Sequence, residues 1–472
     1  MRMRQLRGPL LFSFVLFLLF EGVARVLAGL GAIALEPGDI HGFDRIHRGD
    51  EVPVEDRLYR TDRDLIFRLR PGFRTVYDRA SLYPGRLTTY AVETNDRGYR
   101  TQRFSQKKAP GVFRIVCLGD SSTFGMNVEA ADAYPGVLSE LLEAIEPGRF
   151  EVLNLGVPGY TSRQGLELIR REVAAYEPDL VTFGFGSNGR FWPGAMTDDA
   201  TMRFNQSRLG GLTLAAKDGL DHLYSYRLLR RAVTSVLYSI VDRGVLARRG
   251  PRRVTLDGLR DAIVAAHEEL DRRGAVLMVL DNDLAKTDAR EGIRSGVAAS
   301  GAPHLDMRGL FDDERRERTR QIAAEHRLPP PKARDGAFLV RVRAPGRAVV
   351  TLEWRPFLGE GSTDPMRDDG RQGDQVAGDG IWSLYARWTP GQRVLYAYWA
   401  GTEGEDVREF HPGTPIGGSW RVDLVPDAAI GDIDEFGHYY LHTDNAHPDE
   451  QGHRLIAETL LPAVLEIEAG SP

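Results

Sequence analysis

The chain has 472 residues, of which 42% are hydrophobic and 27% are charged, so it holds enough apolar material for two or three cores and is not a disordered protein. Its net charge of −6 comes from basic and acidic residues spread along the chain, which excludes the basic surface typical of nucleic-acid binding. A single cysteine, Cys117, excludes an intrachain disulfide framework and a thiolate zinc cluster.

The amino terminus combines basic residues with a long apolar run. Arginines near the start precede the apolar run Pro9–Phe20, and the apolar character resumes through Val26–Leu35. This pattern predicts a transmembrane signal anchor over residues 1–35, with the bulk of the chain outside the cytoplasm. The alternative is a cleaved secretory signal, because the basic start, the apolar run and the small residues near Ala28 suit it as well.

A polar extension separates this segment from a region in which strands and helices alternate. Residues 36–110 are rich in Arg and Asp, and we expect them to form a membrane-proximal extension. The elements predicted after it are strand Phe113–Leu118, helix Tyr134–Ile145, strand Val152–Leu155, a helical stripe over Leu166–Tyr176, strand Leu180–Phe185, helix Leu259–Arg273 and strand Ala275–Leu280. Such alternation predicts a parallel sheet covered by helices.

The pattern changes after a predicted helix over Phe311–His326, which ends near the prolines of residues 329–331. Residues 335–425 alternate between apolar and polar side chains, and this predicts a small β-sandwich. Apolar residues at helical spacing return in Glu450–Glu468, so we expect residues 426–472 to rejoin the α/β core and the β-rich segment to be an insert.

Small polar residues follow the first predicted strand of the sheet. Gly119, Asp120 and Ser121 come directly after the apolar run that contains Cys117. A serine at the carboxyl end of a parallel strand, followed by a helix, can act as a nucleophile whose own N–H faces a developing oxyanion. Taken alone, the same residues also suit a plain turn, because Asp and Ser bond nearby backbone groups.

The ends of the next two strands carry glycine and asparagine. Gly156 follows the second strand, and Asn188 follows the third within Gly186-Ser187-Asn188. A glycine N–H and an asparagine amide are donors suited to an oxyanion, although each residue by itself also suits an ordinary turn.

A histidine and an aspartate lie three residues apart before the terminal helix. Asp444 can orient His447, which leaves the other imidazole nitrogen free to take a serine proton. The alternative is that Asp444 caps the helix and His447 is solvated.

Together these blocks resemble the SGNH hydrolases, also called the GDSL esterase family. The resemblance covers residues 111–334 and 426–472 and implies a flavodoxin-like three-layer α/β/α fold. It implies that the catalytic residues are Ser121 as nucleophile, His447 as base and Asp444 as orienter, and that the oxyanion hole consists of Ser121 N–H, Gly156 N–H and the Asn188 side chain. It calls for no metal and no organic cofactor. Gly189 stands where family members often carry Asp, which puts the neighbouring hydrogen bonds in doubt but not the triad.

The segment before the nucleophile strand carries a second, less specific resemblance. The apolar amino terminus followed by Asn95-Asp-Arg-Gly-Tyr-Arg100 is similar to membrane-anchored bacterial SGNH proteins. This implies a catalytic domain in the periplasm or at the cell surface.

Four aspartates gather in a loop of the predicted insert: Asp368, Asp369, Asp374 and Asp379. Their oxygens suit calcium, but the run lacks the spacing of an EF-hand and Asp-Gly pairs also make turns, so we favour turns.

The expected function is a serine esterase that hydrolyses carboxylic esters through an acyl-enzyme. Its expected partners are the membrane, through the amino-terminal helix, and an ester substrate, either an O-acyl (acetyl) group on an extracytoplasmic glycan or a lipid ester; nucleic acid is not expected. The alternatives are an O-acyltransferase acting on cell-surface polysaccharide and a non-catalytic glycan-binding or assembly protein.

Overall fold

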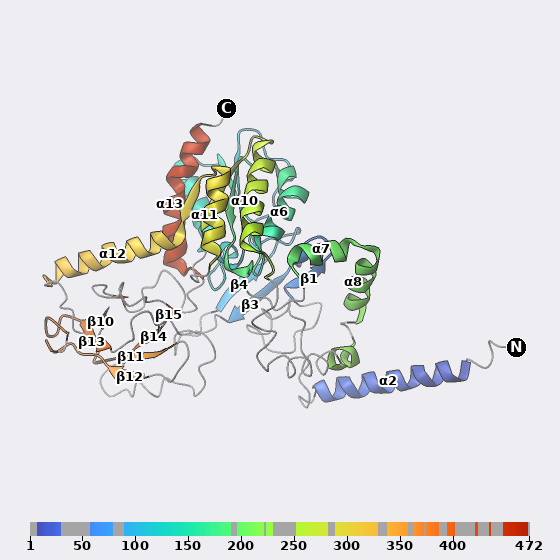
Figure 1. The fold of residues 1–472 in the computed structure, drawn as a ribbon, viewed down its shortest axis with the longest axis horizontal. Coiled ribbons are helices and arrows are strands. Elements are labelled where there is room, and N and C mark those ends of the chain that lie inside the picture. The colour runs from blue at the N-terminus through green and yellow to red at the C-terminus, as the bar shows by residue number, and fades with distance from the viewer. Residues whose placement is uncertain are drawn as a thin grey trace.

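The computed structural model describes residues 7–29, 57–78, 89–189, 196–220, 223–229, 252–281, 288–328, 338–356, 362–371, 373–386, 394–401, 421–422, 434–435 and 447–470. The predicted role of Asp444 falls outside these residues. Figure 1 shows the sheet and its helices in the upper part of the view, and the β-rich insert at the lower left.

A parallel sheet lies at the centre of the fold. Its strands are β5 (Phe113–Gly119), β6 (Phe150–Asn154), β7 (Leu180–Gly184), β8 (Val276–Asp281) and β9 (His304–Asp306). The spatial order is β6-β5-β7-β8-β9, and every neighbouring pair is parallel. In chain order this is 2-1-3-4-5, the order of flavodoxin-like folds, so the predicted α/β core with a parallel sheet is confirmed.

Helices cover both faces of this sheet. One face carries α6 (Ser162–Arg171), α10 (Leu256–Asp271) and α11 (Ala289–Ser300), and the other carries α5 (Tyr134–Ile145), the start of α12 (Met307–Glu325) and α13 (Glu450–Ala469). Successive residues of β5 point to opposite faces: Val116 packs with the first set of helices and Cys117 with the second. The hydrolase-like region therefore has three layers, and α13 returns the chain to it as predicted.

Two of these elements escaped the sequence analysis. Strand β9 is three residues long, too short to show a periodic pattern. Helix α11 contains Gly292 and Gly296, which lower helix propensity. A Cβ at Gly296 would lie 2.8 Å from Ile263 of α10, so these glycines allow the two helices to pack closely.

The extension before the sheet packs onto the hydrolase-like region. Its strands are β1 (Tyr59–Asp62), β2 (Ile66–Leu69), β3 (Arg74–Asp78) and β4 (Thr89–Glu93), which pair antiparallel as β1 with β2 and β3 with β4. Buried side chains from this segment, among them Tyr77 and Tyr90, belong to the same hydrophobic cluster as Val116 and Leu118 of β5. The described part of the extension therefore shares a core with the sheet.

Helix α2 (Arg7–Gly29) corrects one prediction. Among the residues that the structure describes, no helix is long and apolar enough to cross a membrane, so the predicted transmembrane helix and membrane partner are not supported. The apolar run is interrupted by Glu21 and Arg25, whose side chains form an ion pair at 2.9 Å. The Glu21 carboxylate also accepts the backbone N–H groups of Tyr224 at 2.9 Å and Ser225 at 2.8 Å. The Glu21 side chain of this helix is thus hydrogen-bonded to the backbone of another segment of the protein.

The predicted insert is rich in β structure. One sheet has the order β13 (Ile381–Ala386), β10 (Phe338–Arg343), β16 (Asp434–Glu435), and a second has β12 (Ser362–Pro365), β11 (Val349–Pro356), β14 (Val394–Gly401), β15 (Arg421–Val422). All pairs are antiparallel except β10 with β16, so a short part of residues 426–472 pairs with the insert. The face-to-face packing of a sandwich stays a prediction. The described helices also include α7 (Asp198–Gln206) and α8 (Arg208–Leu220).

Candidate active site

A tight turn presents Ser121 at the carboxyl edge of the sheet. Strand β5 ends at Gly119, and the short helix α4 (Ser121–Phe124) begins two residues later. The Asp120 carboxylate caps this helix by accepting the N–H of Ser122 at 3.0 Å. Ser121 is therefore the first helical residue, and its side chain is half-buried. The chain order reverses beside β5, which is where ligands bind in doubly wound sheets.

Gly119 has no room for a side chain at this turn. A Cβ there would lie 2.0 Å from Thr123 Oγ1 and 2.7 Å from the carbonyl oxygen of Gly184. The close approach of α4 and β7 thus explains why glycine precedes Asp120 and Ser121 in the motif.

The structure brings Ser121 and His447 together from opposite ends of the region. Ser121 Oγ lies 2.7 Å from His447 Nε2. In a neutral imidazole, Nε2 can accept the hydroxyl proton only when Nδ1 carries the ring proton, so this contact suits a general base in that tautomer. His447 is thus bonded to Ser121, in contrast to the solvated alternative. The helix that follows, α13, is capped by Asp449, which accepts the N–H of Gly452 at 2.8 Å.

The two other predicted oxyanion donors lie close to the nucleophile turn. The N–H of Gly156 donates to Asn154 Oδ1 at 3.0 Å. The Asn188 amide donates to Asp120 Oδ2 at 3.2 Å and to the Tyr160 carbonyl oxygen at 3.1 Å. Asn188 is therefore tied to the residue that caps α4. To bind an oxyanion, the Gly156 N–H and the Asn188 amide must either donate to the substrate as well as to these acceptors or give up a protein acceptor. Their role in an oxyanion hole therefore stays a prediction.

Gly156 packs directly against the backbone of the nucleophile helix. A Cβ at this position would lie 2.3 Å from Phe124 N and 2.7 Å from the carbonyl carbon of Thr123. Because both atoms belong to the backbone, an added methyl group must displace either the loop after β6 or α4.

We therefore expect Gly156→Ala to lower kcat/KM for ester hydrolysis by about 10²-fold, since a displacement of ~1 Å at reacting groups can cost that much. Steady-state kinetics with an aryl ester measures the effect. Gly219→Ala in α8 is the control, because nothing lies within 4 Å of a Cβ there, and its activity should be unchanged. A folded Gly156→Ala protein with wild-type kcat/KM would contradict this expectation.

Arg100 is a site residue that the sequence analysis did not assign. Its buried guanidinium donates to the carbonyl oxygens of Phe124 at 3.0 Å, Gly125 at 2.7 Å and Val128 at 2.9 Å, and to that of Ala91 at 2.6 Å. Burial lowers the pKa of Arg100 to about 10. Arg100 thus holds the chain that follows Ser121 against the extension.

The motif that contains Arg100 forms a turn around Asn95. The Asn95 side chain accepts the N–H groups of Arg97 at 2.9 Å and Tyr99 at 3.0 Å. Gly98 has a φ of +85°, and a Cβ there would lie 2.6 Å from the Leu69 carbonyl oxygen. In the sequence, the resemblance of this motif to membrane-anchored bacterial SGNH proteins is the signal that points to Arg100.

Cys117 lies in the strand that carries Ser121 but faces the other way, into the core. Burial raises the pKa of the Cys117 thiol to about 12, so the thiol is neutral. Tyr134 and Thr182 contact it there. This agrees with a packing role for the cysteine.

The aspartates of the insert adopt turns and also lie close together. The Asp368 carboxylate accepts the N–H groups of Gly378 at 2.8 Å, Asp379 at 3.1 Å and Gly380 at 3.1 Å. Asp369 Oδ1 accepts the N–H of Arg371 at 3.0 Å. The carboxylate oxygens of Asp368, Asp374 and Asp379 lie within 4.8 Å of one another, which is close enough to share a cation. The backbone bonds agree with the favoured interpretation as turns.

Comparison with known proteins bears on the same region. The model of the GDSL-like lipase/acylhydrolase family matches residues 117–326, which contain Ser121, Gly156 and Asn188. A search of curated proteins gives no match.

Several solved structures are similar to this chain. A lipase/acylhydrolase from Enterococcus faecalis is 17% identical, with 42% of this chain and 78% of that chain covered and a TM-score of 0.25. The acetylxylan esterase Axe2 from Geobacillus stearothermophilus is 15% identical, with 43% and 78% covered and a TM-score of 0.25. The alpha/beta hydrolase LAE5 from the metagenome of Lake Arreo is 17% identical, with 43% and 80% covered and a TM-score of 0.26.

The family match and the Ser121–His447 pair agree with each other. The matched residues contain the turn that presents the serine, and the parallel sheet has the order expected for this fold. Residues 117–326 thus match a GDSL-like lipase/acylhydrolase domain, and the chain is an ester-hydrolysing enzyme.

Proposed function

We propose that the protein is a serine esterase in which Ser121 is the nucleophile, His447 the general base and Asp444 the residue that orients the imidazole. The observation that carries this proposal is the 2.7 Å contact between Ser121 Oγ and His447 Nε2 at the carboxyl edge of the sheet. A nucleophile and base within hydrogen-bond reach are the signature of covalent catalysis by serine.

The proposed reaction has two halves. Ser121 Oγ attacks the ester carbonyl while His447 takes the hydroxyl proton, and His447 then gives that proton to the leaving alkoxide. Water, deprotonated by His447, next attacks the acyl-enzyme, and the carboxylic acid leaves as Ser121 regains its proton. The N–H groups of Ser121 and Gly156 and the Asn188 amide are proposed to stabilise the oxyanion in both halves.

The proposed substrates are O-acyl groups, above all acetyl groups, on an extracytoplasmic glycan, with a lipid ester as the second class. What supports the glycan is the β-rich insert beside an ester-hydrolysing domain, together with the amino-terminal pattern typical of export.

Fluorophosphonate labelling followed by acetate release tests the proposal. We expect the probe to label the full chain at Ser121, and the enzyme to release acetate from acetylated glycans, simple aryl esters or both. Lipid esters of matched acyl length serve as the second substrate class. No labelling of the wild type would contradict the assignment of Ser121 and favour the non-catalytic alternative. Acylation of an added sugar acceptor without ester hydrolysis would favour an O-acyltransferase.

We also propose an extracytoplasmic location for the catalytic domain. It is supported by the basic residues that precede the apolar run Pro9–Phe20. A carboxyl-terminal fusion to a reporter that is active only outside the cytoplasm should be active in bacterial cells. An inactive but intact fusion would contradict the proposal.

A further inference from the structure

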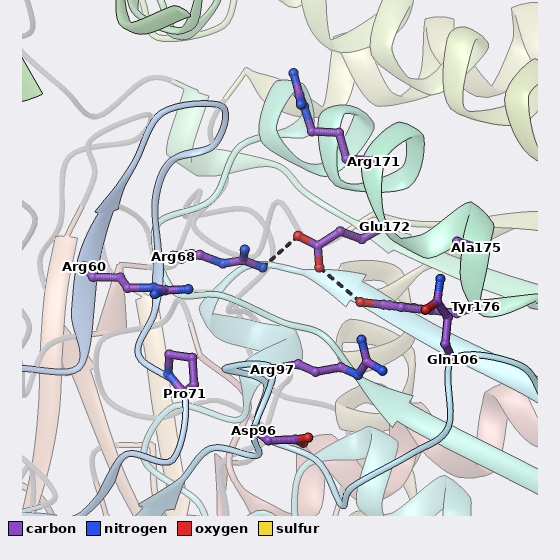
Figure 2. A pocket seen from close by; sticks show the side chains of 10 residues that line it. All are labelled: Arg60, Arg68, Pro71, Asp96, Arg97, Gln106, Arg171, Glu172, Ala175 and Tyr176. Carbon is purple, nitrogen blue, oxygen red and sulfur yellow. Dashed lines mark hydrogen bonds and ion pairs between the residues drawn. The ribbon is translucent and has the colours of Figure 1, made fainter. Parts of the chain in front are cut away.

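A pocket of about 330 Å³ lies between the extension and the end of α6, and its lining is rich in arginine. Figure 2 shows the side chains that line it. The charged members are four arginines and two carboxylates: Arg60, Arg68, Arg97, Arg171, Asp96 and Glu172. Neither Ser121 nor His447 lines this pocket, so it is distinct from the catalytic pair. The lining carries an excess of positive charge.

Two of the four arginines are neutralised within the protein. The Glu172 carboxylate accepts hydrogen bonds from Arg68 Nη2 at 2.7 Å and from the hydroxyls of Tyr99 at 2.6 Å and Tyr176 at 3.1 Å. Arg171 forms ion pairs with Glu167 at 2.6 Å and Asp64 at 3.1 Å, and it points away from Glu172 in Figure 2. Glu172 is therefore fully engaged. Among the described residues, neither Glu172 nor the carboxylates that pair with Arg171 form an ion pair with Arg60 or Arg97.

Arg97 packs beside two aromatic rings and has no ion-pair partner among the described residues. Its guanidinium carbon lies 5.3 Å from the ring centre of Phe104 and 5.6 Å from that of Tyr176. Its Nε is buried and makes no hydrogen bond within the part of the chain that the structure describes. A planar guanidinium fixed by two rings is pre-organised to bind a planar or tetrahedral oxyanion.

Arg60 lies beside Arg68 on the neighbouring strand of the β1–β2 hairpin, where the two residues are directly paired. Figure 2 shows both side chains extending from the hairpin into the pocket. Partial burial and the neighbouring positive charge of Arg68 lower the pKa of Arg60. Asp62 and Glu172 offset this effect in part, but Arg60 forms no ion pair among the described residues, so its guanidinium is available to a ligand.

We propose that this arginine pocket binds the oxyanion group, carboxylate or phosphate, of a small anionic ligand, with Arg60 and Arg97 as its principal cations. Its volume lies at the lower end of the range for small-molecule sites and suits a charged group attached to one sugar-sized moiety. Arginine forks bind such groups through paired N–H donors, which gives geometric specificity as well as charge complementarity.

The position of the pocket predicts a second property. Arg60 and Arg97 belong to the extension, whereas Glu172 and Tyr176 follow α6 in the hydrolase domain. A ligand held between the two segments binds only while they are packed together. Binding therefore stabilises the folded chain by mass action, and thermal unfolding reports it.

Thermal unfolding and isothermal titration calorimetry of the full chain, with inorganic phosphate as the probe, test the proposal. We expect saturable binding and a rise in Tm beyond that in chloride of matched ionic strength. Arg60→Gln and Arg97→Gln should each weaken phosphate binding at least about tenfold. Arg74→Gln is the control, because Arg74 is exposed and pairs with Glu93 outside the pocket, and it should bind phosphate as the wild type does.

Two further ligands distinguish the sources of the oxyanion. Glucuronate represents carboxylated sugars, and glycerol phosphate represents phosphate monoesters; binding of either one with loss in Arg60→Gln supports the pocket. Absence of binding by phosphate and by both ligands would overturn the proposal, as would binding that survives Arg60→Gln unchanged. Arg60 is exposed, so we expect Arg60→Gln to fold. Binding to this variant therefore tests the proposal even if Arg97→Gln does not fold. Hydrolysis of a neutral aryl ester should stay at the wild-type rate in Arg60→Gln, which separates this site from the catalytic pair.

Discussion

Ser121→Ala should lower kcat for ester hydrolysis by at least about 10⁴-fold and abolish fluorophosphonate labelling, while the protein stays folded. The physical reason is that the alanine variant has no atom to form the acyl-enzyme, and only binding and oxyanion donors remain to accelerate attack by water. The hydroxyl is half-buried and contacts His447 Nε2, so its loss should cost little stability. Kinetics with an aryl ester and thermal unfolding of the same preparation measure both effects.

Ser122→Ala is the matched control, since Ser122 is the next residue along α4 and the substitution keeps its backbone N–H, which bonds the Asp120 cap. It should still be labelled by the probe. His447→Gln should lower kcat to a similar extent as Ser121→Ala, and combining the two should add almost nothing, because residues that act as a unit are not additive. Labelling of Ser121→Ala, or a double variant whose losses multiply, would contradict the assigned pair.

The proximity of Ser121 and His447 could be predicted from the sequence because its signals are local. Ser121 comes two residues after the largely apolar strand β5, and His447 precedes a helix whose periodicity is plain. The carboxyl ends of parallel strands meet at one edge, so a correct fold class brings such residues together without knowledge of any contact. The structure then adds the distance, and it shows that Asp449 caps α13.

The polar interior could not be predicted in the same way. The largest fully buried side chains include Arg57, Arg100, Arg114 and Arg308, and the local sequence around them does not predict their burial. A buried arginine bonded to backbone carbonyls has no periodic signature, because its partners lie on other elements. Arg114, for example, donates to the Gln106 carbonyl oxygen at 2.9 Å, and the same guanidinium contacts the Tyr176 carbonyl oxygen. Only tertiary structure separates these arginines from the exposed ones.

The amino-terminal helix is the opposite case. Its apolar run is a strong local signal, but the contacts it makes in the folded chain do not support the predicted membrane span. The apolar run favoured a membrane span, but Glu21 is only 7% exposed and is bonded to backbone N–H groups of Tyr224 and Ser225. A buried carboxylate with protein donors belongs to a folded contact, and hydropathy alone does not report that contact.

Arg100→Met should lower the free energy of unfolding by about 3–5 kcal/mol, one of the largest effects expected for a residue that does not touch substrate. Methionine keeps much of the length of arginine but has no donor, so the carbonyl oxygens of Ala91, Phe124, Gly125 and Val128 lose a hydrogen bond. The charge itself is costly to bury, as the lowered pKa of about 10 indicates, and removing it returns part of that cost. The loss should therefore be smaller than four separate bonds would suggest.

The same change should also lower kcat, because Phe124 and Gly125 end the helix that begins at Ser121. Urea unfolding gives the stability, and steady-state kinetics below the unfolding transition give kcat. Arg74→Met is the control on the same extension: Arg74 is exposed and its ion pair with Glu93 spans 2.9 Å, so both quantities should change little, by no more than about 0.5 kcal/mol in stability. Equal stability of the two variants would show that the carbonyl groups around Arg100 find other donors. If Arg100→Met were destabilised but kept the wild-type kcat, Arg100 would hold the extension in place without positioning the nucleophile turn.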